Sequence, residues 1–263
     1  MKHYRILIIV LVVFFYQCKT TTNLGEEEVI KNQSNPMEIY LLIGQSNMAG
    51  RAAIELQDQD SINHVFLFTG NEKKPWEKAA NPLNKYSTVR KKIAMQKLGP
   101  GYGFAKEMAK TNEGNKIGLV VNAKGGTSIE AWKPGDVLYN EALSQTKKAL
   151  KHGVLKGVLW HQGEANASKY NEYMPKIIEL ITALRQDLEL PDLPFVVGQL
   201  SSDKPKRNNF NKMILELPNH VKNASVVLTE KLSTIDSTHF DSASQRLLGK
   251  RYAKNMLKLI TPY

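Results

Sequence analysis

Short apolar runs recur along the chain, and each is rich in β-branched residues and bounded by Gly, Pro or Asn. Runs of this length and composition predict β-strands. Both faces of the runs are apolar, which favours a parallel sheet covered by helices on both sides. The predicted strands are residues 38–43, 65–68, 116–121, 154–160, 194–200 and 224–229.

Amphipathic stretches separate several of these strands, with apolar residues near the 3.6-residue spacing of a helix. In the third stretch, Pro175 marks a break or a first-turn position. The alternation of strands and helices predicts one α/β domain. Residues 51–101 are the least regular, and we expect them to form a large insertion or lid beside the upper edge of the sheet. The predicted helices are residues 104–111, 138–152, 170–188 and 242–260, the first of them following a Gly-Pro-Gly-Tyr-Gly turn.

The beginning of the chain differs from the rest. Lys2 and Arg5 precede an unbroken apolar run at residues 6–16. The run is short for a membrane span and typical of the core of a signal peptide. A buried N-terminal element is the alternative, which the basic flank and the polar segment behind the run disfavour. We therefore predict a signal peptide at residues 1–18, a flexible polar tether at 19–36 and a folded domain at 37–263.

Cys18 is the only cysteine, so the domain has no disulfide and depends on its core for stability. Its place directly after the apolar run resembles the acylation site of bacterial lipoproteins, although Phe15, Tyr16 and Gln17 stand where small residues are usual. The sequence thus predicts an exported lipoprotein, periplasmic or at the cell surface, tethered to a membrane through Cys18. Simple secretion and an uncleaved anchor are the alternatives.

The formal net charge is +11. A basic surface can attract nucleic acids or anionic polymers. The lysines are scattered, however, and no nucleic-acid-binding motif is present. We therefore expect a solvated basic surface without a nucleic-acid partner. The histidines show no zinc-type spacing, and phosphate-loop and dinucleotide motifs are lacking, so we expect no metal and no cofactor.

Ser46 lies in the segment GQSNMAG, residues 44–50, directly after the predicted strand 38–43. The carboxyl end of a strand is where α/β folds place ligands, and the amides of a following helix can face an oxyanion. The segment is not the Gly-x-Ser-x-Gly elbow of other hydrolases. A capping serine in an ordinary turn is the alternative.

Asp236 and His239 precede the last predicted helix with a spacing that lets both side chains point the same way. A histidine that binds a carboxylate through one ring nitrogen keeps the other nitrogen free to accept a proton. The pair is therefore a candidate for general base chemistry, and a surface pair or a core histidine is the alternative.

Two further strand ends carry polar or flexible residues. Gly125 and Gly126 follow the strand 116–121, and paired glycines there free backbone N–H groups for an oxyanion, unless they serve the turn alone. Gln162 and Glu164 follow the strand 154–160 within WHQGE. Since the carboxyl ends of parallel strands share one edge, we expect all these residues to meet in one crevice.

The motifs GQSNMAG, NAKGGTSIEAW, WHQGE and DSTHFD, in this order, resemble those of the SGNH hydrolase superfamily. More closely, they resemble the sialate O-acetylesterase and acetylxylan esterase group, carbohydrate esterase family 6. The resemblance runs from about residue 38 to 260. It implies a flavodoxin-like three-layer α/β/α fold with a central, mostly parallel sheet of about five strands. It also implies an esterase without a cofactor that acts on acetylated carbohydrate, and it implies no protein partner. A lipid or aryl esterase on the same scaffold, or an inactive carbohydrate-binding protein, is the alternative.

The resemblance implies a role for each residue of the hydrolytic centre. Ser46 falls on the nucleophile, His239 on the base and Asp236 on its acidic partner, with Glu164 as an alternative carboxylate. The backbone amides of Ser46 and of Gly125 or Gly126 fall on the oxyanion donors. The side-chain amide falls on Gln162, or on Asn166. Further candidates for binding substrate are Gln45, Asn47 and the tryptophans, of which Trp132 is the best placed to stack on a sugar ring.

Overall fold

The computed structural model describes residues 36–111 and 114–261. The predicted signal peptide with Cys18, and the tether up to residue 35, lie outside the described residues. No helix in the described part of the chain combines the length and apolarity needed to cross a membrane. The described residues belong to one compact unit.

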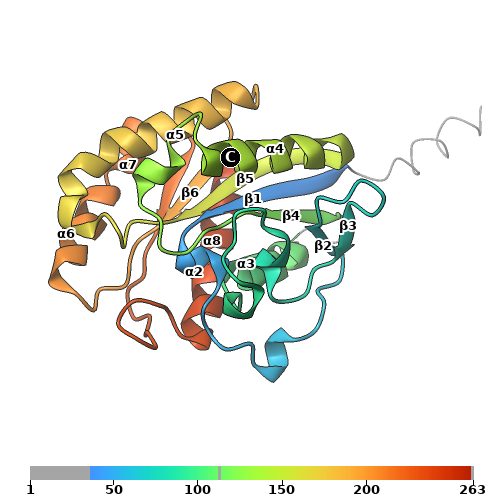
Figure 1. Cartoon of the computed structure of the whole chain (residues 1–263), viewed down its shortest axis with the longest axis horizontal. Coiled ribbons are helices and arrows are strands. Elements are labelled where there is room, and N and C mark those ends of the chain that lie inside the picture. The colour runs from blue at the N-terminus through green and yellow to red at the C-terminus, as the bar shows by residue number, and fades with distance from the viewer. Residues whose placement is uncertain (1–35, 112–113, 262–263) are drawn as a thin grey trace, which may run out of the picture. The chain divides into compact units, whose positions relative to one another are not determined.

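A seven-stranded sheet forms the centre of this unit, in the order β3-β2-β4-β1-β5-β6-β7 (Figure 1). All neighbouring strands run parallel except β3, which pairs antiparallel with β2. This confirms the mostly parallel sheet, with two strands more than the expected five or so. The strands are β1 (Met37–Gly44), β2 (Val65–Phe68), β3 (Trp76–Lys78), β4 (Ile117–Val121), β5 (Gly153–His161), β6 (Phe195–Gly198) and β7 (Ala224–Val227).

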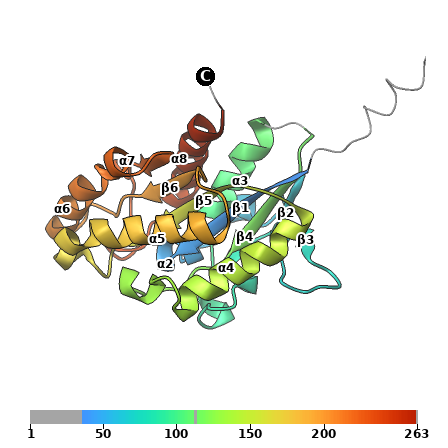
Figure 2. The same ribbon diagram turned by 90° about the horizontal axis from the view of Figure 1, so that it is seen from above.

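Helices cover both faces of the sheet, as the three-layer prediction requires. Figure 2 shows α4 and α5 on one side of the sheet and α3 and α8 on the other. Each face buries its own apolar cluster. The helices are α2 (Ser46–Ala49), α3 (Pro100–Thr111), α4 (Val137–Ala149), α5 (Tyr173–Asp187), α6 (Pro205–Ile214), α7 (Leu217–His220) and α8 (Ser242–Ile260); short 3₁₀ helices are η1 (Leu56–Asp58), η2 (Leu83–Tyr86), η3 (Ile93–Met95), η4 (Ile129–Trp132), η5 (Leu150–His152) and η6 (Ala167–Glu172).

The glycine-rich segment before residue 104 is helical, so its prediction as a turn is wrong. Pro100 begins α3, where its fixed φ suits the first helical turn. A Cβ at Gly103 would lie 2.5 Å from the carbonyl oxygen of Arg246 in α8, and one at Gly249 would lie 2.3 Å from the carbonyl oxygen of Pro100. The glycines therefore let α3 and α8 pack backbone against backbone, a tertiary reason that local propensity does not contain.

The expected insertion or lid at residues 51–101 is in part sheet, because it contributes β2 and the unpredicted β3 to one edge. Other parts of it reach the loop after β4. Asn84 accepts a hydrogen bond from the backbone N–H of Ala123 and donates to its carbonyl, both at 3.0 Å. Ser87 donates to the Asn122 side chain at 2.8 Å. This stretch thus buttresses the carboxyl edge of the sheet.

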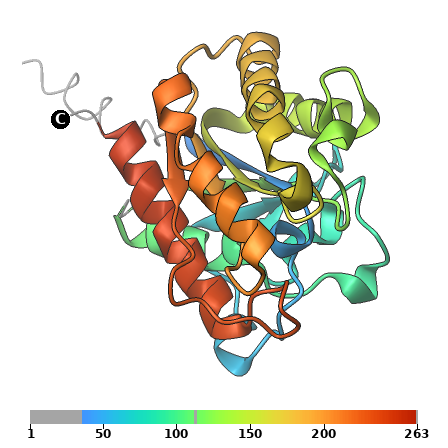
Figure 3. The same cartoon turned by 90° about the vertical axis from the view of Figure 1, so that its left-hand side faces the viewer.

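The chain reaches that edge again between β7 and α8. Figure 3 looks onto α8, with the loop that leads into its first turn at the lower end of the helix. Asp241 caps α8 by accepting a hydrogen bond from the Ser244 amide at 2.8 Å. Since His239 lies two residues before the cap, the helix fixes the exit of the loop that carries it.

Candidate active site

Ser46 begins α2 directly after β1, in a turn that only glycine permits. Gly44 has φ +133°, and a Cβ there would lie 2.2 Å from the carbonyl oxygen of His161 at the end of β5. The next amide, that of Gln45, donates to this same carbonyl at 2.8 Å. Ser46 itself is 6% exposed. The turn is therefore pinned to the neighbouring strand, with the serine at the carboxyl edge of the sheet.

The structure brings the predicted serine, histidine and aspartate together. The hydroxyl of Ser46 lies 2.9 Å from Nε2 of His239, and Nδ1 of His239 lies 2.6 Å from Oδ2 of Asp236. An ionised carboxylate only accepts, so Nδ1–H donates to Asp236 and Nε2 accepts from the serine. This is the arrangement in which an imidazole can take the serine proton.

The Asp236 carboxylate is held by the backbone as well. Its Oδ1 accepts from the amides of His239 at 2.7 Å and Thr238 at 3.0 Å. Burial alone would raise the pKa of Asp236, but the hydrogen bonds from His239 and Thr238 outweigh it, and the pKa lies below its usual value. The loop therefore favours the charged carboxylate that orients the imidazole.

Replacing Asp236 by asparagine is expected to destabilise the protein at neutral pH but not at low pH. A carboxylate whose pKa is lower in the folded protein stabilises it above the unfolded pKa of about 4, and this contribution is lost as pH falls through the folded pKa. The difference in melting temperature between wild type and Asp236→Asn should therefore shrink below pH ~4 in thermal unfolding followed by circular dichroism. A difference that stayed constant down to pH ~2 would contradict this account of the loop.

Two backbone N–H groups beside the serine are available to an oxyanion. Across residues 36–111 and 114–261, the amides of Ser46 and Gly125 donate to no acceptor. A Cβ at Gly125 would lie 3.4 Å from Cβ of Ser46, whereas Gly126 is exposed, with φ +77°. Of the two glycines considered, Gly125 is therefore the one beside the nucleophile.

Gln162 does not offer its amide as the predicted third donor. The residue is fully buried, and its Nε2 faces three acceptors: Oε1 of Gln45 at 3.2 Å, the carbonyl of Thr127 at 3.1 Å and Oδ1 of Asn166 at 2.8 Å. An amide has two hydrogens, so none remains for an oxyanion. The alternative, Asn166, donates instead to both oxygens of Glu130 at 3.2 and 3.0 Å. The side chains of Gln162 and Gln45 thus bind to each other and support the loops around Ser46.

Glu164 does not orient His239, because Asp236 occupies Nδ1. Oε1 of Glu164 instead accepts a hydrogen bond from Nδ2 of Asn47 at 2.6 Å. Asn47, which is fully buried, also donates to the carbonyl of Thr238 at 3.1 Å and accepts from the amide of Phe240 at 3.1 Å. Asn47 therefore joins the serine turn, the histidine loop and the end of β5 in one hydrogen-bonded junction.

The prediction that Trp132 stacks on a sugar ring is wrong. Its side chain is fully buried, packs edge-on against Trp160 at 5.3 Å between ring centroids, and donates to Oγ1 of Thr127 at 3.1 Å. Trp160 is also fully buried. Trp76 packs on Gly118 near the amino ends of the strands, away from Ser46. Trp132 and Trp160 are therefore core residues, and Trp76 is partly buried against the core, so the site residues described above include no tryptophan ring.

Sequence reasoning missed Arg207, which holds the histidine loop from α6. It is 3% exposed and donates to Oγ of Ser201, to the carbonyl of Ser237 at 2.6 Å and to Oγ1 of Thr238 at 3.0 Å. No carboxylate within the described ranges pairs with it. A lone arginine in a polar helix carries no spacing signal. The only sequence hint was a charged residue three positions before the apolar Phe210.

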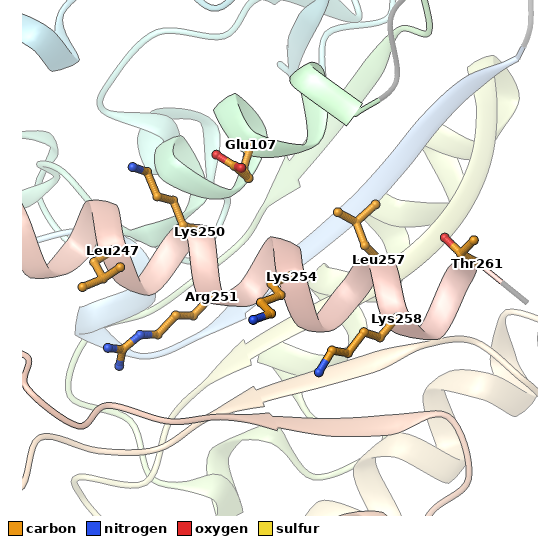
Figure 4. Close-up of a pocket in the computed structure, with 8 residues that line it drawn as sticks. All are labelled: Glu107, Leu247, Lys250, Arg251, Lys254, Leu257, Lys258 and Thr261. Atoms are coloured by element: carbon orange, nitrogen blue, oxygen red, sulfur yellow. The ribbon is translucent and has the colours of Figure 1, made fainter. Parts of the chain in front are cut away.

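A surface pocket along α8, with Glu107 of α3 in its lining, is distinct from this site. It has a volume of about 610 Å³ and its walls carry basic residues of α8, with Glu107 opposite (Figure 4). None of the candidate site residues lines it. No group of three His, Cys, Asp or Glu side chains in the described part of the chain is arranged to hold a metal ion.

Known proteins resemble this chain in sequence and in fold. The chain is 32% identical over 198 residues to the "probable carbohydrate esterase At4g34215" of Arabidopsis thaliana, covering 68% of this chain and 75% of that protein. The crystal structure of the Arabidopsis protein superimposes with a TM-score of 0.78 at 28% identity, covering 86% of this chain and all of that one. Human sialate O-acetylesterase is 32% identical over 122 residues, 35% of this chain and 23% of the human protein.

Residues 36–258 match the family described as carbohydrate esterase, sialic acid-specific acetylesterase. The match spans β1 to the last turns of α8 and includes every residue of the site above. It confirms the resemblance that the four motifs indicated. The chain therefore belongs to this family of carbohydrate esterases and is a carboxylic-ester hydrolase.

Proposed function

We propose that the protein removes acetyl groups from carbohydrate hydroxyls through an acyl-enzyme formed on Ser46. The observation that carries the proposal is the continuous hydrogen-bonded chain from Ser46 through His239 to Asp236, at 2.9 and 2.6 Å. Family membership supports the substrate class, and the geometry supports the mechanism.

Each residue has one task in this mechanism. His239 removes the proton of Ser46 as its oxygen attacks the acetyl carbonyl, while Asp236 stabilises the imidazolium that forms. The amides of Ser46 and Gly125 receive the oxyanion. His239 then protonates the departing sugar oxygen. A water molecule, deprotonated by the same histidine, releases acetate and restores the serine.

The substrate is proposed to be a glycan acetylated in the manner of sialate or xylan. The name of the human relative, sialate O-acetylesterase, and the family description support the sialate-type sugar. The basic Lys91 close to Gly126 also favours a sugar with a carboxylate. A lipid or aryl esterase is the alternative, and faster hydrolysis of esters with longer acyl chains would reveal it.

Acetate release from a panel of acetylated glycans tests this function. We expect turnover of O-acetylated sialate or acetylated xylan, faster hydrolysis of p-nitrophenyl acetate than of the octanoate, and a loss of about 10⁵-fold or more in kcat for Ser46→Ala. Faster hydrolysis of the octanoate would favour the lipid esterase. Equal acetate release by wild type and Ser46→Ala would refute a serine mechanism.

We further propose that the domain is exported and tethered through an acylated Cys18. The basic start, the apolar run and the lone cysteine support this. Metabolic labelling with a radioactive fatty acid tests it, since wild type should incorporate label and Cys18→Ser should not. Equal labelling of both would exclude acylation at this cysteine.

A further inference from the structure

Arg51 directly follows the serine turn and presents a partly unused guanidinium. Its Nη1 donates to the carbonyls of Gly50 at 2.6 Å and Met95 at 3.0 Å. Within residues 36–111 and 114–261, its Nη2 and Nε donate to no acceptor. The planar guanidinium is therefore held at one nitrogen and offers another, in a fixed direction, to a group that the protein itself does not supply.

The unused nitrogen lies at the reaction centre. A Cβ built on Gly125 would lie 2.4 Å from Nη2 of Arg51 and 3.4 Å from Cβ of Ser46. The guanidinium and the serine side chain therefore flank the same point above Gly125. This is the glycine whose amide also lacks an acceptor. The Arg51 guanidinium and the amides of Gly125 and Ser46 are therefore three donors in one small region beside Ser46.

The charge of Arg51 is not balanced by the protein. No carboxylate lies within 4.0 Å of it among the described residues. Partial burial lowers the pKa of Arg51, but a guanidinium stays protonated at neutral pH. On the other side of the glycine pair, Nζ of Lys91 lies 3.2 Å from the Cβ position of Gly126. Two positive charges therefore flank the glycine pair, and they favour binding of a negatively charged group there.

We propose that Arg51 is a catalytic residue whose Nη2–H stabilises the oxyanion formed when Ser46 attacks the acetyl carbonyl. This rests on the proposed function and assigns to Arg51 the part that the sequence suggested for Gln162. As the bond from Oγ to the carbonyl carbon forms, the carbonyl π electrons move to its oxygen. They return when the bond to the sugar oxygen breaks. The guanidinium keeps its protons throughout and acts by charge and hydrogen bonding.

Arg51→Met is the direct test. Loss of one oxyanion donor typically costs about 10²-fold or more in kcat. We expect such a loss on p-nitrophenyl acetate, with little change in KM, and a smaller loss for Arg51→Lys. A boronic acid, which forms a tetrahedral anion on the serine, should bind Arg51→Met more weakly by a similar factor, because the variant loses an interaction made only with the tetrahedral state.

Arg185→Met is the matched control. Arg185 also donates to backbone carbonyls, those of Leu193 at 2.8 Å and Lys222 at 2.8 Å, but at the amino edge of β6 and β7. This variant should keep the kcat of wild type. Melting temperatures of all variants separate folding from catalysis, and Arg51→Lys supplies the kinetic measurement if Arg51→Met does not fold.

The possible outcomes distinguish failure of the role proposed for Arg51 from failure of the proposed esterase function. If Ser46→Ala is inactive while folded Arg51→Met, or Arg51→Lys in its place, keeps both wild-type kcat and boronate affinity, the inference fails and the serine mechanism stands. A loss confined to KM for acidic sugars also overturns the inference, because Arg51 would then bind a substrate carboxylate. If wild type and Ser46→Ala hydrolyse p-nitrophenyl acetate equally, the proposed function itself fails.

Discussion

Ser46→Ala is expected to lower kcat for acetyl ester hydrolysis by about 10⁵–10⁶-fold, and His239→Ala by a similar factor. The serine supplies the attacking oxygen, and the histidine 2.9 Å away is the base positioned to accept its proton. Neither step has a substitute, because Asp236 contacts the far ring nitrogen and Glu164 is bound to Asn47. Steady-state hydrolysis of p-nitrophenyl acetate measures both losses.

The double variant Ser46→Ala/His239→Ala distinguishes a catalytic unit from two independent residues. Residues that act in one step are strongly non-additive, so the double variant should be no slower than either single variant. Residual turnover would then come from the oxyanion donors alone. A double variant slower than both by the product of their losses would show that serine and histidine act separately, which the proposed mechanism forbids.

The strands could be predicted because buried parallel strands are nearly continuous apolar runs. Six of them were found this way, and β3 was not, since three residues at an antiparallel edge carry too little pattern. The helix α6 was also missed, because its segment, PKRNNFNKMI, is mostly polar and Phe210 and Ile214 are its only buried apolar residues. The start of α3 was misjudged because its glycines serve a contact with α8 that only the folded chain reveals.

For the site as well, features close together in sequence could be predicted, and contacts between distant segments could not. The residues at the strand ends could be found because they lie next to predicted strands in recognisable motifs. Which group binds which could not be found, because the hydrogen-bond partners are far apart in sequence. The amide of Gln162 faces Gln45, Thr127 and Asn166, a set that no spacing indicates. Arg207 approaches the histidine loop from another helix altogether.

Hydrogen bonds between loops therefore decide whether the site is assembled. The serine turn is held by β5 through the carbonyl of His161, and the histidine loop is held by Arg207 and by the cap of α8. Each anchor fixes one loop to the rigid sheet or helices. In the part of the chain that the structure describes, the Asn47 side chain joins the two loops beside the Ser46–His239 hydrogen bond itself, so it holds nucleophile and base in position.

Asn47→Ala is expected to lower kcat by about 10²–10³-fold, because a displacement near 1 Å between reacting groups costs about that much. It should also lower the free energy of unfolding by about 3 kcal/mol, because buried groups of Glu164 and Phe240 lose their partner. Asn47→Asp should be at least as harmful, since it turns an oxygen toward Glu164 and the Thr238 carbonyl in place of the amide. Urea unfolding and steady-state kinetics measure the two effects.

Asn211→Ala separates the loss of stability from the loss of activity. Asn211 is also a buried asparagine that joins two segments, donating to the carbonyl of Leu200 at 2.9 Å and accepting from its amide at 2.8 Å. Its removal should cost a similar free energy of unfolding but leave the folded enzyme active, because it does not touch Ser46 or the histidine loop. Equal losses of kcat in both variants would mean that Asn47 only stabilises the fold. A loss of kcat specific to Asn47 ties activity to the junction that holds nucleophile and base in register.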